Sequence, residues 1–186
     1  MSFKKILVAV NNSPLSRHVF AQALDLAVLN KAVIRLIHCI SPEMVGGTTL
    51  MMPHQTVLPQ NLTLNDYQTQ GILIEQRIQE SQEMLERYRQ EAFNQGVPTE
   101  AEYQVGEPGQ QICEIATDWG ADLITIGRRG YTGLAEALLG SVSNHVVHHA
   151  PCSVLVIQEV GPEPPDSLVS DLSSVTINPF PSQEAT

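Results

Sequence analysis

Three glycines and a serine near residue 130 are the residues of this chain best suited to chemistry. Gly127 and Gly130 follow an apolar run at residues 123–126, and Gly140 is followed at once by Ser141. A strand, a loop and a Gly-Ser pair at the start of a helix predict unpaired backbone N–H groups, which bind phosphate with help from the helix dipole. The spacing, G-x2-G-x9-G-S, differs from G-x-x-x-x-G-K-[ST] and from G-x-G-x-x-G, and neither of those motifs occurs. We predict an anion site of a different kind.

Apolar runs that end at turn residues predict the elements that position this loop. Residues 6–10 are apolar and rich in β-branched types, as in strands buried on both faces of a parallel sheet. Ser13 and Pro14 then favour a helix, as N-cap and first helical residue. We expect strands at residues 6–10, 33–40, 100–105, 123–126 and 152–157, with helices near 14–29, 74–92, 108–119 and 139–149.

This alternation predicts an α/β fold with a single doubly wound, five-stranded parallel sheet in the order 3-2-1-4-5 and helices on both faces. In such sheets ligands bind beyond the carboxyl ends of the strands, where the strand order reverses. The first strand ends at Asn11, the second at Cys39 to Ser41 and the fourth at Gly127. We expect these three ends to line one crevice.

Charge and cysteine content limit the classes of protein to which this chain can belong. The formal net charge is −10 over 186 residues, which disfavours nucleic acid as a partner because phosphate backbones need a basic surface. No apolar run reaches the roughly 18 residues of a membrane span, and the apolar run at the N-terminus is too short for a signal sequence. Three cysteines within apolar patterns indicate buried free thiols of a reducing compartment. We expect a cytoplasmic protein.

Two segments fall outside the periodic pattern. Residues 41–66 carry two adjacent glycines, prolines and the apolar Leu50, Met51 and Met52, and are predicted to form an irregular insertion. Those apolar residues would act as a lid over a ligand, contact a partner, or pack incidentally. Residues 159–186 hold five acidic residues and no Lys or Arg, with scattered prolines, which predicts a flexible tail. The domain is therefore placed at residues 1–158.

The loop and the strands together resemble the universal stress protein family. The resemblance rests on Gly127, Gly130, Gly140 and Ser141 at their spacing, on ILVAV before a turn that holds Ser13, on LIHCI, and on G-E-P before a helix that leads into G-A-D-L-I. It covers roughly residues 4–158. It implies a small α/β domain that dimerises and, in the members that carry this loop, holds ATP.

The resemblance also implies which residues would contact the nucleotide. The loop and the start of the last helix would carry the phosphates and ribose, and the ends of the first two strands would frame the adenine. The implied binding residues are Val10, Asn11, Asn12, Ser13, Cys39, Ile40, Ile126, Gly127, Arg128, Arg129, Gly130, Gly140, Ser141, Val142 and Ser143. The ligand would be ATP, with or without Mg²⁺, and ADP or AMP would also fit.

The first turn departs from the family pattern. The family commonly has Asp-Gly-Ser there, whereas this chain has Asn11, Asn12 and Ser13. Asn12 is a mild change, because Asn tolerates positive φ better than other residues with a side chain. Asn11 matters more: a carboxylate helps to hold a metal that bridges phosphates, whereas an amide keeps only hydrogen bonding, worth about 1 kcal/mol. Binding survives this change, and metal-assisted hydrolysis is disfavoured.

Other polar residues allow more than one interpretation. Arg128 and Arg129 are either solvated loop charges or phosphate ligands, which their place after a strand favours. His145 and His149 have the i,i+4 spacing of a metal pair, with His148 beside them, but no Glu or Cys stands at ligand spacing and the helix dipole alone favours histidine there. We predict no metal site. His38 is expected to be a satisfied core residue.

Three hypotheses of function remain open. The first is a regulatory ATP-binding module that responds to stress through protein partners, and the second is a slow ATP hydrolase, for which no general base is evident. The third is a scaffold that binds partners and leaves its nucleotide site unused. Residues 154–157, from Val154 to Ile157, form an apolar edge strand, so we expect a homodimer that pairs two such strands. No catalytic residue is assigned.

Overall fold

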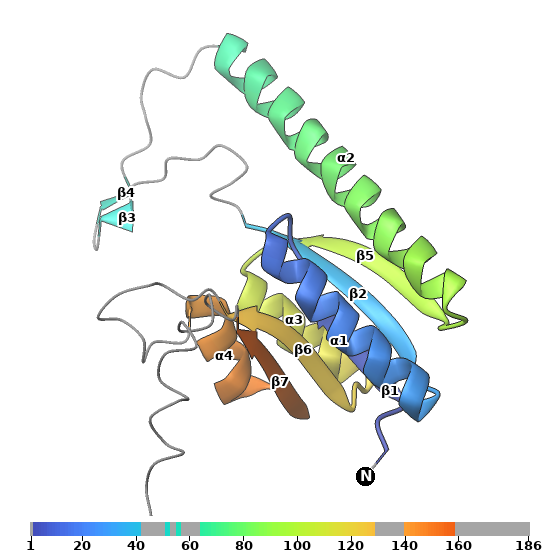
Figure 1. Ribbon diagram of the computed structural model, residues 1–186. Helices are drawn as coiled ribbons and strands as arrows, with labels where there is room; N and C mark the ends of the chain where they lie inside the picture. The colour runs from blue at the N-terminus through green and yellow to red at the C-terminus, as the bar shows by residue number, and fades with distance from the viewer. Residues whose placement is uncertain (1, 42–50, 53–54, 57–63, 129–139, 159–186) are drawn as a thin grey trace, which may run out of the picture.

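A computed structural model describes residues 2–41, 51–52, 55–56, 64–128 and 140–158. In these ranges the chain alternates strands and helices (Figure 1). The strands and helices are β1 Lys5–Ala9, α1 Pro14–Asn30, β2 Val33–Ile40, β3 Met51–Met52, β4 Gln55–Thr56, α2 Leu64–Asn94, β5 Thr99–Val105, α3 Pro108–Trp119, β6 Leu123–Arg128, α4 Ser141–His149 and β7 Ser153–Gln158.

The central sheet has five parallel strands in the order β5-β2-β1-β6-β7. This is the order 3-2-1-4-5 of the main strands, so the predicted topology is confirmed. The chain moves outward from β1 through β2 to β5, then crosses back to β6 and outward to β7. The strand order therefore reverses between β1 and β6. We call the edge at which the parallel strands end the carboxyl edge.

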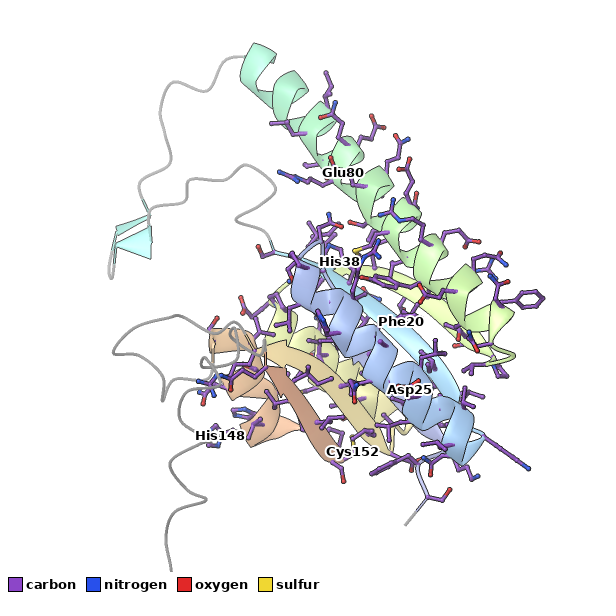
Figure 2. All side chains as sticks on the ribbon, in the orientation of Figure 1. Phe20, Asp25, His38, Glu80, His148 and Cys152 are labelled. Carbon is purple, nitrogen blue, oxygen red and sulfur yellow. The ribbon has the colours of Figure 1, made fainter. Side chains whose placement is uncertain are left out.

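Two hydrophobic layers cover the sheet, one on each face. On one face the buried side chains of α1 and of the C-terminal half of α2 pack on alternate residues of β1 and β2, and Phe20 of α1 contacts Tyr88 of α2 with ring centroids 4.7 Å apart (Figure 2). On the other face, α3 and α4 contribute Ile112, Ala116 and Val146 to the second layer. β1 is buried within the sheet, as its apolar sequence predicts.

Several boundaries differ from the sequence predictions. α2 begins at Leu64, so the last three residues of the predicted 41–66 insertion are helical, and a two-residue antiparallel ladder of β3 and β4 lies within that insertion. The helix prediction started at Ile74 because apolar periodicity marks only the turns that face a core. The first turns of α2 extend beyond the sheet (Figure 1), and Ile72 and Leu73 are exposed there.

The strand predicted to stop at Ile126 continues to Arg128. Gly127 and Arg128 pair with Ile157 and Gln158 of β7, so Gly127 lies inside a strand rather than in a loop. The last helix begins at Ser141, two residues later than predicted. Within the described residues no helix is both long and apolar enough to span a membrane. The predicted tail, residues 159–186, lies outside the described ranges.

Candidate functional site

The reversal in strand order places the end of β1 between the ends of β2 and β6. Ala9 lies opposite Ile37 of β2 and Ile126 of β6, and the N–H of Val10 still donates to the Ile37 carbonyl at 3.0 Å. Beyond Val10 the chain leaves the sheet at Asn11. The residues that follow β1 therefore emerge at the switch point, next to the end of β6.

A compact hydrogen-bond network fixes the turn after β1. The side-chain oxygen Oδ1 of Asn11 accepts from the N–H of Ser13 at 2.9 Å and from the hydroxyl of Ser16 at 2.8 Å. The Ser16 hydroxyl in turn accepts from the N–H of Asn11 at 2.8 Å. Ser16 is buried and Asn11 half-buried. The first turn of α1 is thus tied to the end of β1.

Ser13 is the N-cap of α1 as predicted, but its side chain makes no capping hydrogen bond. The Asn11 side chain accepts from the Ser13 N–H instead, and the hydroxyl of Ser16 bonds both to the side chain and to the N–H of Asn11. Sequence reasoning missed Ser16. The signal was available, since it is a polar residue directly beside the core-facing Leu15 in an otherwise apolar helix face.

His38 of β2 makes a hydrogen bond to the residue that precedes this turn, Val10. Its Nδ1 lies 2.9 Å from the carbonyl oxygen of Val10, and the side chain is buried (Figure 2). A carbonyl only accepts, so Nδ1 carries the proton and donates. His38 is the satisfied core residue that the sequence predicted.

Gly127 lies on the face of β6 that meets α1, at the closest approach of helix and strand. A Cβ added there would lie 2.9 Å from Leu15 Cδ2, and 3.1 Å from both Leu15 Cγ and Val19 Cγ2. Its φ is not positive, so the glycine is required by packing and not by backbone conformation. This explains one motif glycine without reference to a ligand.

The N-terminus of α4 lies in the same part of the fold. Gly140 is its N-cap, and the first intrahelical bond runs from the N–H of Asn144 to the Gly140 carbonyl at 2.9 Å. The N–H groups of Ser141, Val142 and Ser143 precede that bond and have no partner among the described residues. They form a set of donors at the positive end of the helix dipole.

The three side chains on this turn differ in their orientation. Ser141 is exposed and Val142 half-buried, whereas Ser143 is buried and its hydroxyl donates to the Gly140 carbonyl at 3.0 Å. The Ser143 hydroxyl therefore supports the turn. Among the described residues, a Cβ at Gly140 would meet nothing closer than the Ser143 hydroxyl at 3.8 Å, so they do not crowd this glycine as they crowd Gly127.

Arg128 closes β6 at the carboxyl edge. Its backbone pairs with Gln158 of β7, and its Nη1 donates to the Gln158 side-chain oxygen at 3.3 Å. The guanidinium is half-buried. It places a permanent positive charge at the end of the strand that leads toward α4.

Cys39 and Ile40 end β2 on the other side of β1. The N–H of Gly106 donates to the Ile40 carbonyl at 3.1 Å, and the Cys39 thiol lies 3.9 Å from the Pro108 carbonyl. Burial, with smaller effects of Glu102 and Glu107, raises the pKa of the Cys39 thiol to about 12. The thiol is therefore protonated at neutral pH and is no nucleophile.

The predicted site residues fall into three groups: those around the switch point, those at the end of β2, and those outside the described residues. The first group lies in the turn after β1, at the end of β6 and at the start of α4, and consists of Asn11, Asn12, Ser13, Ile126, Gly127, Arg128, Gly140, Ser141, Val142 and Ser143. The second group consists of Cys39 and Ile40 at the end of β2, with Val10 beside them. Asn12 is exposed. Arg129 and Gly130 lie outside the described residues.

The three histidines of α4 lie farther along the helix, His145 at its middle and His148 and His149 in its last turn. His145 and His149 stack with ring centroids 4.2 Å apart, and the Nδ1 of His149 lies 2.8 Å from the His145 carbonyl. In the described part of the chain, no cluster of three His, Cys, Asp or Glu side chains is arranged to hold a metal ion.

The site can bind an anionic ligand. Backbone donors of α4 and the charge of Arg128 suit phosphate oxygens. Among the described residues, the turn after β1 and the end of β6 contribute no carboxylate. Fold and site together define a small doubly wound α/β protein with donors gathered at its topological switch point.

Comparison with known proteins identifies the class further. A sequence profile of the universal stress protein family matches residues 2–158. The chain is 34% identical over 167 residues to the universal stress protein Sll1388 of Synechocystis, a match that covers 85% of this chain and 99% of that one. The chain belongs to the universal stress protein family.

Solved structures share the fold. The structure of hypothetical protein MJ0577 has a TM-score of 0.68 at 23% identity, over 87% of this chain and all of that one. A universal stress protein of Archaeoglobus fulgidus in complex with dAMP has a TM-score of 0.53 at 22% identity, over 84% and 99% of the two chains. A family protein of Arabidopsis thaliana with AMP bound gives 0.51 at 22% identity, over 89% and 99%. The last two of these structures hold the adenine nucleotides dAMP and AMP.

Proposed function

We propose that this protein is a regulatory module that binds an adenine nucleotide, with ATP as its ligand, at the carboxyl edge between β1 and β6. The observation that carries the proposal is the set of N–H groups of Ser141, Val142 and Ser143, for which the described residues supply no hydrogen-bond partner and which lie within the same strand-end region as Arg128 and Asn11. Such donors favour phosphate oxygens. Related folds with AMP and dAMP bound support an adenine nucleotide over other anions.

The proposed role is binding and signalling rather than hydrolysis. The described site offers no carboxylate at the switch point to activate water, and the Cys39 thiol stays protonated because burial raises its pKa to about 12. Of the histidines of α4, His148 and His149 lie in its last turn, away from the N-terminal donors, and His145 lies at its middle. In this proposal the protein acts in the cytoplasm, and nucleotide binding changes the surface that a partner protein recognises.

We propose that the working unit is a homodimer. β7 is an edge strand of the sheet, and its residues Val154, Leu155, Val156 and Ile157 are only half-buried in one copy. An apolar edge without proline or charge pairs readily with a second strand. Pairing two copies of β7 about a two-fold axis would cover it, and light scattering at micromolar concentration should give twice the monomer mass; a monomer mass would contradict the dimer.

The test of nucleotide binding uses the thermal midpoint of unfolding. A ligand at 100 times its dissociation constant stabilises the folded state by about 2.7 kcal/mol, which raises the midpoint by roughly 5–10 °C for a protein of this size. We expect ATP to produce such a shift in wild type. Gly140→Ala adds a methyl group beside the α4 donors, where the nearest described atom is 3.8 Å away, and it should reduce the shift that ATP produces. Because alanine is a poorer N-cap than glycine, the variant should lose about 0.5–1 kcal/mol of stability without ATP. No shift with ATP, ADP or AMP would exclude the proposal.

A further inference from the structure

The amide of Asn11 is locked in one orientation by its neighbours. Its Oδ1 accepts from the Ser13 N–H at 2.9 Å and the Ser16 hydroxyl at 2.8 Å. A backbone N–H donates and never accepts, so a flipped amide would point its NH₂ group at another donor. The hydrogen-bond partners of this amide therefore fix which of its two outer atoms is the oxygen and which is the nitrogen.

Ser16 adds a second constraint. Its oxygen accepts from the Asn11 N–H, so its single proton is committed to Asn11 Oδ1. Because Ser16 is buried in α1, this pair is shielded from competing water. Both lone pairs of Oδ1 are thereby used, and none is left for a cation.

The remaining polar group of Asn11 is its NH₂ group. No hydrogen bond of Asn11 Nδ2 occurs among the described residues, and the side chain is half-buried at the switch point. The outward end of the Asn11 side chain therefore offers two N–H donors and no acceptor. Arg128 and the N–H groups of Ser141, Val142 and Ser143 add further positive potential at the carboxyl edge.

A carboxylate at residue 11 would behave in the opposite way. It would use one oxygen for the bonds of Ser13 and Ser16 and present the other, with negative charge, to the ligand. Oxygen ligands of that kind hold Mg²⁺ beside phosphates, whereas an NH₂ group repels a cation. Whether the outward atom of residue 11 is a nitrogen or an oxygen thus decides whether this side chain contacts the phosphates directly or through a metal ion.

We infer that this protein binds ATP without a divalent cation, with Asn11 as a specificity-determining residue whose Nδ2 donates directly to an unprotonated oxygen of the nucleotide. This inference rests on the proposed nucleotide site. It states which form of the ligand that site takes: the metal-free polyphosphate, its charge met by N–H donors and Arg128 in place of Mg²⁺.

The experiment measures the ATP dissociation constant by calorimetry, once in excess EDTA and once in millimolar Mg²⁺. Millimolar Mg²⁺ converts nearly all free ATP to its Mg²⁺ complex, so for wild type, which takes the metal-free form, we expect an apparent dissociation constant at least about tenfold higher in Mg²⁺ than in EDTA. For Asn11→Asp we expect at least a tenfold loss of affinity in EDTA, because a donor becomes a negative charge, and recovery of most of that loss in Mg²⁺. Asn94→Asp is the matched control: it adds the same charge at the end of α2, at the opposite edge of the sheet, and should bind ATP as wild type does in both buffers.

The outcomes separate the inference from the proposed function. If wild type binds ATP in Mg²⁺ as tightly as in EDTA, or more tightly, the inference is wrong while the nucleotide site stands. If Asn11→Asp shows the same affinity as wild type in EDTA, Asn11 does not contact the ligand and the inference is also wrong. If wild type binds no ATP in either buffer, the proposed function fails and the inference with it. Circular dichroism checks the fold of each variant, and the wild-type comparison decides the question even if Asn11→Asp does not fold.

Discussion

Gly127→Ala should separate the packing role of the motif glycines from a ligand-binding role. The added Cβ would lie 2.9–3.1 Å from three atoms of Leu15 and Val19. Favourable carbon–carbon contacts lie at 3.5–4.0 Å, so α1 must move or its side chains must leave their rotamers. Both side chains are at most 5% exposed and have no free space to move into.

The expected cost follows from this crowding. Inserting a methyl group into a well-packed core costs about 1–3 kcal/mol. Ala is otherwise acceptable to the backbone, because φ at Gly127 is not positive, and it favours a strand slightly over Gly. We expect a net loss near 2 kcal/mol in the free energy of unfolding, or about 4–8 °C in the thermal midpoint.

The assay is urea unfolding of Gly127→Ala, Leu15→Ala and the double variant. Leu15→Ala removes two of the three crowded atoms, so the double variant should be more stable than the sum of the single effects predicts, by about 1 kcal/mol or more. Gly140→Ala is the control, because among the described residues its Cβ meets nothing closer than 3.8 Å; its only expected cost is that of a poorer N-cap, about 0.5–1 kcal/mol, and that cost should add to the effect of Leu15→Ala without coupling. The packing argument is refuted if Gly127→Ala unfolds at the same urea concentration as wild type, or if the two substitutions are strictly additive.

Three further predictions concern other parts of the fold. Burial raises the pKa of the Cys39 thiol from its ordinary value of 9.0 to about 12. The stability that the neutral thiol contributes is therefore complete below pH 9 and is lost as the pH rises toward 12. Between pH 8 and 10.5, the free energy of unfolding measured with urea should fall by about 2 kcal/mol more for wild type than for Cys39→Ala. Asp122→Ala should cost about 1–2 kcal/mol in the same assay, because Asp122 Oδ2 accepts from the N–H groups of Lys4 and Lys5 at 2.8 and 2.9 Å; an unchanged midpoint would show that water replaces both bonds. Trp119 is the only tryptophan and lies at the end of α3, with Lys5 5.4 Å and Arg35 5.0 Å from its ring, so its fluorescence should report unfolding and change little on addition of ATP.

The sheet was predictable from sequence because burial leaves a direct pattern. β2 was predicted at residues 33–40, its observed bounds, and the strand order follows from the alternation of strands with helices. The first turns of α2 were missed because the sequence shows no clear apolar period before Ile74, and the described apolar residues Ile72 and Leu73 are exposed. Exposed helical turns leave no such pattern to reveal them.

The sequence predicts where the residues of the candidate site lie better than it predicts what each of them does. The turn at Asn11 and the start of α4 lie in the strand-end region where the sequence placed them. The role of Gly127 in packing against α1 depends on a contact between elements far apart in the chain, which spacing alone does not encode. The orientation of the Asn11 amide likewise depends on Ser16, a partner that only the folded turn brings within 2.8 Å.

Titration of ¹⁵N-labelled protein with ATP tests the central claim most directly, because it reports on each N–H group separately. The largest chemical-shift changes should occur at the backbone amides of Ser141, Val142 and Ser143 and at the side-chain NH₂ of Asn11, and should saturate together with one dissociation constant. Changes that cluster elsewhere in the fold, or no changes at millimolar ATP, would contradict a nucleotide site between β1 and β6.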